Sequence, residues 1–254
     1  MSDVRLDRDG PVATITLDRP SALNAQTPAT WAALARIGRD LPGDVRVVVV
    51  RGEGGSFSAG LDKALFAGER IGDAPSFREM AAMAQDECDA VIAGYQAAFT
   101  WLRRPGIVSV AAVQGHAIGA GFQLALACDL RILASDAQLA MAETTLGLVP
   151  DLAGTKPLVA LTGEARALEI CLTGRRIGAT EAERIGLATL VVPRDGLDAA
   201  VADLTAALLA APRDAVTETK ALILGARQRS HAEQEAAERA AQGRRLRDLA
   251  GLGE

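Results

Sequence analysis

Hydrophobic and polar residues follow two different patterns along the first two thirds of the chain. Runs that are apolar throughout or alternate with a period near two, both typical of β-strands, lie at 12–18, 45–51, 108–113, 129–134 and 138–141. Between these runs, helical stretches are predicted at 27–40, 76–104 and 118–128. Because strands and helices alternate, we expect an α/β fold in this part of the chain.

The pattern changes after Thr155, where helices dominate. They are predicted at 163–172, 180–186, 197–210, 212–226 and 230–250, with one short strand at 189–192. The last of these helices are amphipathic, so their apolar faces must pack on the preceding core or on a second copy of the chain.

Composition narrows the class of function. The net charge is −5 at pH 7 and the pI is about 5.2, which argues against a nucleic-acid partner. No stretch approaches the roughly 18 consecutive apolar residues of a membrane span, and the N-terminus lacks the apolar core of a signal peptide. The three cysteines are odd in number and far apart, which argues against a metal site or a disulfide framework. We therefore expect a cytoplasmic protein with neither a membrane partner nor a metal.

Two segments rich in small residues could bring backbone amides close to a ligand. The first, FSAGLD at 57–62, follows a turn. The second, QGHAIGAGFQ at 114–123, joins the end of a strand to the start of a helix, whose unpaired amides favour an anion or a developing oxyanion. Its spacing is not the G-x-G-x-x-G of a dinucleotide site. Taken alone, the first segment is better explained as a tight connection, and tight helix–strand packing explains the second as well as catalysis does.

A third segment holds two carboxylates, Glu143 and Asp151, eight residues apart around a glycine-containing turn in apolar surroundings. Desolvation there would raise both pKa values and suit proton transfer near neutral pH. Taken alone, the same residues could equally be a surface charge and a turn or N-cap residue.

Together, the three segments resemble the crotonase (enoyl-CoA hydratase/isomerase) family in their order and spacing. The opening DRP at 18–20 with LNA at 23–25, the sequence CDLRI at 128–132 and the helical tail fit the same resemblance. It implies a crotonase-like ββα spiral core over 1–195. It also implies a C-terminal helical oligomerisation region over 196–254, which would form a homotrimer or a dimer of trimers. The implied substrate is an acyl-CoA thioester, with coenzyme A as part of the substrate and no separate cofactor.

The resemblance also assigns backbone groups to a binding site. The N–H groups of Leu61 and Ala120 match the family's oxyanion hole, which holds the thioester carbonyl and stabilises an enolate. The family usually has glycine where this chain has Ala120, and alanine still donates its N–H. Pocket walls are expected from 64–95. Residues expected to contact the substrate or CoA are Ala25, Ser58, Ala59, Gly60, Asp62, Lys63 and Gly119.

The implied catalytic residues are Glu143, Asp151 and Gln123. Hydratases of the family grip a water between two glutamates, whose positions match Gln123 and Glu143. Because glutamine cannot transfer a proton, we favour double-bond isomerisation of an enoyl- or dienoyl-CoA by Glu143 and Asp151, with Gln123 orienting substrate or water. Three alternatives stay open: hydration by Glu143 with Gln123, a hydrolase- or dehalogenase-type reaction at Asp151, and a non-catalytic acyl-CoA binder.

Overall fold

The structure, a computed structural model, describes residues 3–67, 70 and 72–253. Within these residues the main sheet has six strands, in spatial order β1 (Val4–Asp9), β2 (Val12–Leu17), β3 (Val47–Gly52), β4 (Val108–Val113), β6 (Leu130–Ala134) and β9 (Leu190–Val192). β1 runs antiparallel to β2, and the other neighbours are parallel. A smaller sheet contains β5 (His116–Ile118), β7 (Gln138–Ala140) and β8 (Ile177–Gly178).

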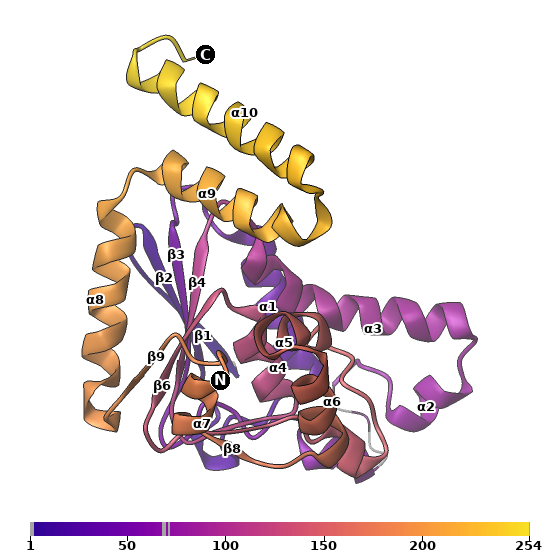
Figure 1. Cartoon of the computed structure of the whole chain (residues 1–254). Coiled ribbons are helices and arrows are strands. Elements are labelled where there is room, and N and C mark those ends of the chain that lie inside the picture. The colour runs from indigo at the N-terminus through magenta and orange to yellow at the C-terminus, as the bar shows by residue number, and fades with distance from the viewer. Residues whose placement is uncertain (1–2, 68–69, 71, 254) are drawn as a thin grey trace.

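Helices cover both faces of the main sheet (Figure 1). On one face lies α8 (Leu197–Ala210), and on the other lie α1 (Pro28–Asp40), α3 (Gln85–Thr100) and α4 (Ala120–Ala127). The valines of β3 show why this strand is apolar throughout. Val47 and Val49 pack in the cluster under α8, whereas Val48 and Val50 belong to the main core. A strand that is buried on both faces needs such a continuous apolar run.

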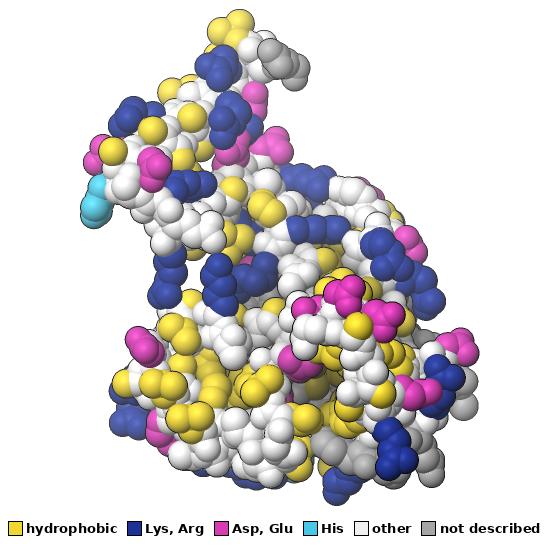
Figure 2. Space-filling model, turned by 90° about the vertical axis from the view of Figure 1, so that its right-hand side faces the viewer, with side chains coloured by type: hydrophobic (Ala, Val, Ile, Leu, Met, Phe, Trp, Pro, Cys, Tyr) yellow, Lys and Arg dark blue, Asp and Glu magenta, His cyan; other side chains and the backbone are white. Residues whose placement is uncertain are grey.

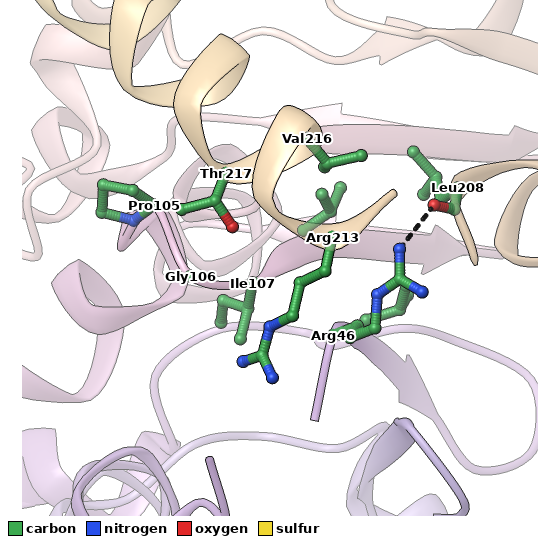
Figure 3. Close-up of a pocket in the computed structure, with 10 residues that line it drawn as sticks. Arg46, Pro105, Gly106, Ile107, Leu208, Arg213, Val216 and Thr217 are labelled. Carbon is green, nitrogen blue, oxygen red and sulfur yellow. Dashed lines mark hydrogen bonds between the residues drawn. The ribbon is translucent and has the colours of Figure 1, made fainter. Parts of the chain in front are cut away.

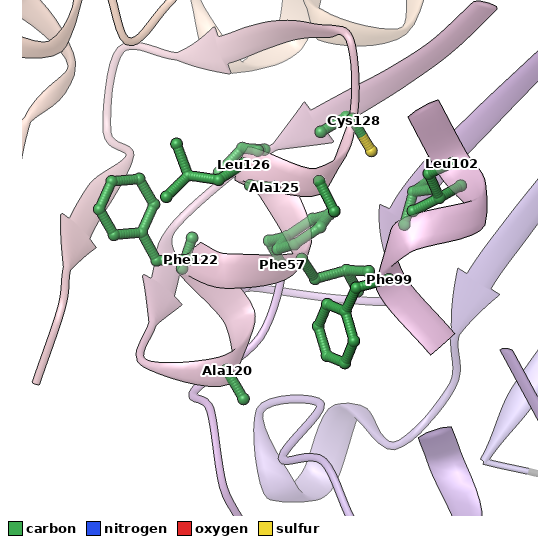
Figure 4. Packing of buried hydrophobic residues seen from close by; sticks show 14 of the residues in the cluster. Phe57, Phe99, Leu102, Ala120, Phe122, Ala125, Leu126 and Cys128 are labelled. Atoms are coloured by element: carbon green, nitrogen blue, oxygen red, sulfur yellow. The ribbon is translucent and has the colours of Figure 1, made fainter. Parts of the chain in front are cut away.

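Helix α4 lies at the centre of the main core, and all eight of its residues are buried. Figure 4 shows Phe57, Phe99 and Leu102 packed beside it. Phe57 is fully buried and is the first residue of the first small-residue segment. Burying a phenylalanine contributes about 2–3 kcal/mol, so this side chain anchors the segment against α4.

One of the remaining helices lies in the first half of the chain, and the others follow residue 154. They are α2 (Phe77–Ala82), α5 (Thr155–Thr162), α6 (Glu164–Thr173), α7 (Ala179–Arg184), α9 (Arg213–Gly225) and α10 (His231–Leu249). Short 3-10 helices lie at Pro20–Ala22, Lys63–Ala67, Trp101–Arg103, Glu143–Leu146, Arg194–Gly196 and Ala226–Gln228. No helix within the described residues is long and apolar enough to cross a membrane.

Polar contacts attach the C-terminal helices to the core. Arg46 donates hydrogen bonds to the carbonyl oxygens of Leu208, Leu209 and Ala211 at the end of α8, and Figure 3 shows the bond to Leu208. In α9, the Lys220 ammonium group donates to the carboxylate of Asp129 at 2.6 Å and to two backbone carbonyls. Helix α10 packs against α9 and extends away from the sheet (Figure 1, Figure 2). The predicted boundary at 195/196 and the predicted role of 196–254 in oligomerisation stay predictions.

The single helix predicted over 76–104 is wrong. Met83 and Ala84 have extended backbone, with ψ angles of 157° and 153°, and separate α2 from α3. Each of the two helices has its own N-terminal acid. Glu79 accepts a hydrogen bond from the N–H of Ser76, as the predicted capping box requires, and Glu87 accepts one from the N–H of Ala84. The second acid favours the start of a new helix at this point.

The helix predicted over 118–128 starts later than expected. His116–Ile118 pairs with β7 as strand β5, and α4 begins only at Ala120. Gly119 turns the chain between them with φ 50° and ψ −118°, a conformation that side chains with a Cβ rarely adopt.

Candidate active site

The two small-residue segments lie side by side in the wall of a cavity. The N–H of Ser58 donates to the carbonyl of His116 at 2.8 Å, and the N–H of Ile118 donates to the carbonyl of Ser58 at 3.0 Å. Gly60 has a φ of 91°, and a Cβ built on it would lie 2.4 Å from the Ile118 oxygen and 3.6 Å from the Ala120 nitrogen. The close approach of the two segments therefore requires glycine at position 60.

Leu61 and Ala120 both line this cavity. Ala120 is the first residue of α4, where backbone N–H groups have no acceptor within the helix. Neither of these two N–H groups donates to a backbone or side-chain acceptor within 3–67, 70 and 72–253. The cavity wall thus has two unpaired amide donors, one of them at the positive end of a helix dipole.

The cavity has a volume of about 770 Å³, a size suited to a small-molecule ligand. Its walls are mainly apolar, and the predicted wall region 64–95 contributes Phe77, Met80, Ile92 and Tyr95. The other large apolar lining residues are Trp31, Leu61, Ile118, Leu146, Leu148, Val149 and Leu152. Figure 2, which views the molecule from the side of α2 and α3, shows hydrophobic side chains gathered over the lower half of this face.

Glu143 brings a buried carboxylate to the cavity. It opens the 3-10 helix Glu143–Leu146 and is only 8% exposed. Its Oε1 atom accepts a hydrogen bond of 2.7 Å from the Nε2 atom of Gln123, whereas Oε2 has no partner among the described residues. Burial raises the pKa of Glu143, and the negative charge of Asp151 raises it further. Glu143 therefore offers one free carboxylate oxygen with a basicity suited to proton transfer.

Gln123, on α4, joins Glu143 to the segment 152–154. Its Oε1 atom accepts hydrogen bonds from the N–H groups of Leu152 at 2.9 Å and Gly154 at 3.2 Å. A Cβ at Gly154 would lie 2.7 Å from Cγ of Gln123, so the loop approaches the side chain closely. A glutamine side chain has two acceptor sites and two N–H donors, and protein groups occupy all but one N–H.

Asp151 lines the same cavity, and burial raises the pKa of its carboxyl group. Its position is held through the backbone, because Nε2 of Gln96 on α3 donates to the Asp151 carbonyl at 2.7 Å. Two carboxyl groups with raised pKa values thus share one largely apolar cavity, an arrangement suited to acid–base chemistry. No cluster of three or more His, Cys, Asp or Glu residues that could hold a metal ion occurs in the described part of the chain.

Comparison with known proteins decides the family. The family model described as enoyl-CoA hydratase/isomerase matches residues 7–247, nearly the whole chain. The chain belongs to the enoyl-CoA hydratase/isomerase family.

Relatives with solved structures or curated names agree with this family. A candidate enoyl-CoA hydratase from Thermobifida fusca YX, solved in complex with CoA, is 52% identical with a TM-score of 0.93, covering 98% of this chain and 95% of that one. The same protein in complex with acetoacetyl-CoA is also 52% identical with a TM-score of 0.93, over 97% and 96% of the two chains. The carnitinyl-CoA dehydratase of Salmonella arizonae is 39% identical over 201 residues, 78% of this chain and 71% of that protein. These comparisons confirm the predicted family and its crotonase-type fold.

The structure divides the residues predicted to contact substrate or CoA into two groups. Those that line the cavity are Ala59, Gly60, Lys63 and Gly119. Ser58 is fully buried beneath the loop, where its hydroxyl donates to the carbonyl of Asn24 and accepts the N–H of Gly60. It therefore supports the amide segment from below.

Ala25 and Asp62 lie outside the lining of this cavity. Arg19 links them, since its guanidinium group contacts the Asp62 carboxylate at 2.9 Å and donates to the carbonyl of Ala25 at 2.8 Å. A hydrogen bond from the N–H of Ala64 and the charge of Arg19 lower the pKa of Asp62. Contact of Ala25 and Asp62 with the substrate stays a prediction.

Sequence reasoning missed Trp31 and Gln96 as parts of the site, and it included Tyr95 only as one residue of the expected wall region 64–95. The ring centroids of Trp31 and Tyr95 lie 4.8 Å apart, and Nε1 of Trp31 donates a hydrogen bond to Oε1 of Gln26. Nε2 of Gln26 in turn donates to the Ser58 hydroxyl. All three residues lie in predicted helices without a distinctive motif. Contacts across the fold bring Trp31 and Tyr95 to the cavity and Gln96 to the backbone of Asp151.

Proposed function

We propose that the protein binds an acyl-CoA thioester in this cavity and stabilises its enolate at the N–H groups of Leu61 and Ala120. Two unpaired amides in the wall of a largely apolar cavity support this role, as do the CoA ligands of the Thermobifida fusca structures. Preorganised donors of this kind contribute about 3–4 kcal/mol each to the stability of a transition state.

The favoured reaction is movement of a carbon–carbon double bond in an enoyl- or dienoyl-CoA. Glu143 takes a proton from the acyl chain through its free Oε2 atom, and the electron pair of the broken C–H bond moves toward the thioester oxygen. A proton then returns to the other end of the conjugated system from Glu143 or Asp151, so the substrate and product are isomers.

The observation that carries this choice is the hydrogen bonding of Gln123. Its amide is hydrogen-bonded to Glu143 and to the N–H groups of Leu152 and Gly154. An amide cannot act as an acid or a base toward a water molecule. The lining residues with carboxyl groups are Glu143 and Asp151, which makes them the acid–base pair of the proposal.

Hydration is the second candidate, because most of the named relatives carry hydratase or dehydratase names. In that reaction the remaining N–H of Gln123 would hold a water molecule that Glu143 deprotonates. Replacing Gln123 with glutamate would then add the second carboxylate, and the Gln123→Glu variant is expected to hydrate a 2-enoyl-CoA faster than the unchanged protein.

Product analysis by mass spectrometry tests the proposal. The protein is incubated in D2O with a 2-enoyl-, a 3-enoyl- and a 3,5-dienoyl-CoA, alongside the variants Glu143→Gln and Asp151→Asn. Loss of the base is expected to slow double-bond movement about 10²- to 10⁴-fold in Glu143→Gln. The exposed Glu164, at the start of α6, supplies a matched control as Glu164→Gln, which should retain full activity.

The outcomes separate the candidates. A 3-hydroxyacyl product would contradict the isomerase and favour the hydratase. Calorimetric binding of an acyl-CoA with neither product nor deuterium uptake would contradict both reactions and leave a binding protein. Unchanged turnover in Glu143→Gln would remove Glu143 as the base.

A further inference from the structure

The hydroxyl group of Tyr95 is a polar atom without a partner. In the described part of the chain, five buried side-chain polar atoms lack a hydrogen-bond partner, and they belong to Tyr95, Trp101, Glu143, Thr205 and Arg245. Only Tyr95 and Glu143 among these five line the 770 Å³ cavity. A buried polar group without a partner is costly in free energy and therefore calls for an explanation.

Contacts with neighbouring residues fix the position of this hydroxyl. The Tyr95 ring packs on Trp31 with an interplanar angle of 52°, and the Trp31 indole is hydrogen-bonded to Gln26 at 2.8 Å. The next residue, Gln96, is hydrogen-bonded to the Asp151 backbone at 2.7 Å. Because the hydroxyl oxygen lies in the plane of the ring, a held ring also holds the hydroxyl oxygen.

The hydroxyl is available as a donor. Burial raises the pKa of Tyr95, and the negative charge of Asp151 raises it further, so the phenol keeps its proton at neutral pH. Met80 and Ile92 add apolar side chains to the lining of the same cavity. An acyl chain made only of carbon and hydrogen would leave the hydroxyl unpaired in dry surroundings.

We propose that Tyr95 determines acyl-group specificity by donating a hydrogen bond to an oxygen of the acyl chain beyond the thioester carbonyl. The preferred substrates are then acyl-CoAs that carry a keto or hydroxyl oxygen on the chain. This inference rests on the proposed function, since it takes the acyl group to lie in the same cavity. A site that donates to a substrate oxygen discriminates strongly against the analogue without it, because the donor is then left unpaired.

Isothermal titration calorimetry with matched pairs of ligands tests the inference. The pairs are butyryl-CoA with acetoacetyl-CoA and hexanoyl-CoA with 5-oxohexanoyl-CoA, so that the two members of each pair differ by one keto oxygen. The variant Tyr95→Phe removes only the hydroxyl and keeps the ring that packs on Trp31. We expect Tyr95→Phe to raise the dissociation constant of the keto ligand in at least one pair about 5- to 50-fold. The dissociation constants of butyryl-CoA and hexanoyl-CoA should change less than about twofold.

A matched control comes from Thr205, whose unpartnered hydroxyl is buried away from this cavity. Thr205→Val is expected to leave all four dissociation constants unchanged. If Tyr95→Phe raised the dissociation constants of both members of both pairs equally, the inference would be overturned. The effect would then come from altered packing of the cavity, which does not depend on the keto oxygen. Unchanged binding of all four ligands would overturn it as well.

Failure of this inference is distinguishable from failure of the proposed function. Glu143→Gln tests turnover, whereas the ligand pairs test binding and need no reaction. Loss of oxygen discrimination in Tyr95→Phe, measured by binding alone, is the expected result, whatever the rate at which the variant isomerises a plain 3-enoyl-CoA. A drop in that isomerisation with a shifted pH profile and no change in discrimination would instead make Tyr95 a positioning residue for Asp151, and would overturn the specificity role.

Discussion

The two sides of the cavity are built from different parts of the protein. The amide side, residues 58–61 and 118–120, consists of backbone groups joined by strand-type hydrogen bonds. The carboxylate side, residues 143–154, is a 3-10 turn followed by a loop, which the side chains of Gln123 and Gln96 hold in place. It also exposes apolar side chains, with Leu148 at 37% and Val149 at 69% exposure.

This difference suits the two tasks of the proposed reaction. Stabilising a charge on one oxygen needs donors that are already in position and do not reorganise during the reaction, which backbone groups in a packed core provide. Moving a proton between two carbons needs groups that reach more than one point on the substrate. A loop held by side-chain hydrogen bonds, each contributing about 1 kcal/mol, allows such adjustment.

The largest expected effect comes from breaking the amide side at Gly60. In Gly60→Ala the new Cβ would meet the Ile118 oxygen at 2.4 Å, and the φ of 91° disfavours any residue with a Cβ. The two segments must then separate, and displacement of the Leu61 amide is expected to lower kcat/KM by about 10²-fold or more. The change in kcat/KM is measured by steady-state kinetics with the best substrate found in the product analysis.

A matched glycine provides the control for that experiment. A Cβ at Gly106 would meet nothing within 4 Å, so Gly106→Ala should keep full activity and thermal stability. Activity of Gly60→Ala within about threefold of the unchanged protein would contradict a role of this loop in catalysis.

The amide side is also the part of the site that the sequence predicts best. Glycines in fixed order between a strand and a helix indicate a steric requirement of the local backbone, and the structure pairs the two segments through the bridge between Ser58 and Ala117. The core strands were predictable for a similar reason, because burial on both faces demands the continuous valines of β3. Local chemistry determines local structure in these cases.

The carboxylate side was only partly predictable. Glu143 and Asp151 stand out as carboxylates in apolar sequence, but the hydrogen bonds that hold their segment come from Gln123 and Gln96, which are 20 and 55 residues away from their partners. The break at Met83 and Ala84 was missed because the apolar spacing continues across it. Contacts across the fold decide these features, and no periodicity along the chain records them.

An intermediate effect is expected from Asp151→Asn, which tests the electrostatic coupling within the carboxylate side. The charge of Asp151 raises the pKa of Glu143, so its removal lowers that pKa. A base must be ionised to act, and kcat/KM therefore rises with pH through the pKa of Glu143. The rising limb of the pH profile is expected to move to lower pH in the variant, while dienoyl-CoA isomerisation falls about tenfold or more.

The profile is measured with a 3-enoyl-CoA, for which Glu143 alone could suffice and enough activity should remain. Asp195, in the 3-10 helix Arg194–Gly196, lies outside the cavity and provides the control Asp195→Asn, whose profile should match that of the unchanged protein. A rising limb that stays in place or moves to higher pH in Asp151→Asn would mean that the two carboxylates do not interact through charge.

The smallest effect is expected from Gln96→Leu, which loosens the carboxylate side without touching a carboxylate. The substitution removes the hydrogen bond of 2.7 Å to the Asp151 carbonyl and leaves that oxygen without its donor. A single hydrogen bond of about 1 kcal/mol corresponds to roughly a fivefold change in rate, so kcat should fall by that order with little change in KM. Gln85→Leu, at an exposed position of the same helix, controls for the change in polarity and should leave both constants unchanged. A loss in Gln96→Leu as large as that in Gly60→Ala would show that the loop is as rigidly required as the amide segments, and would remove the distinction between the two sides of the cavity.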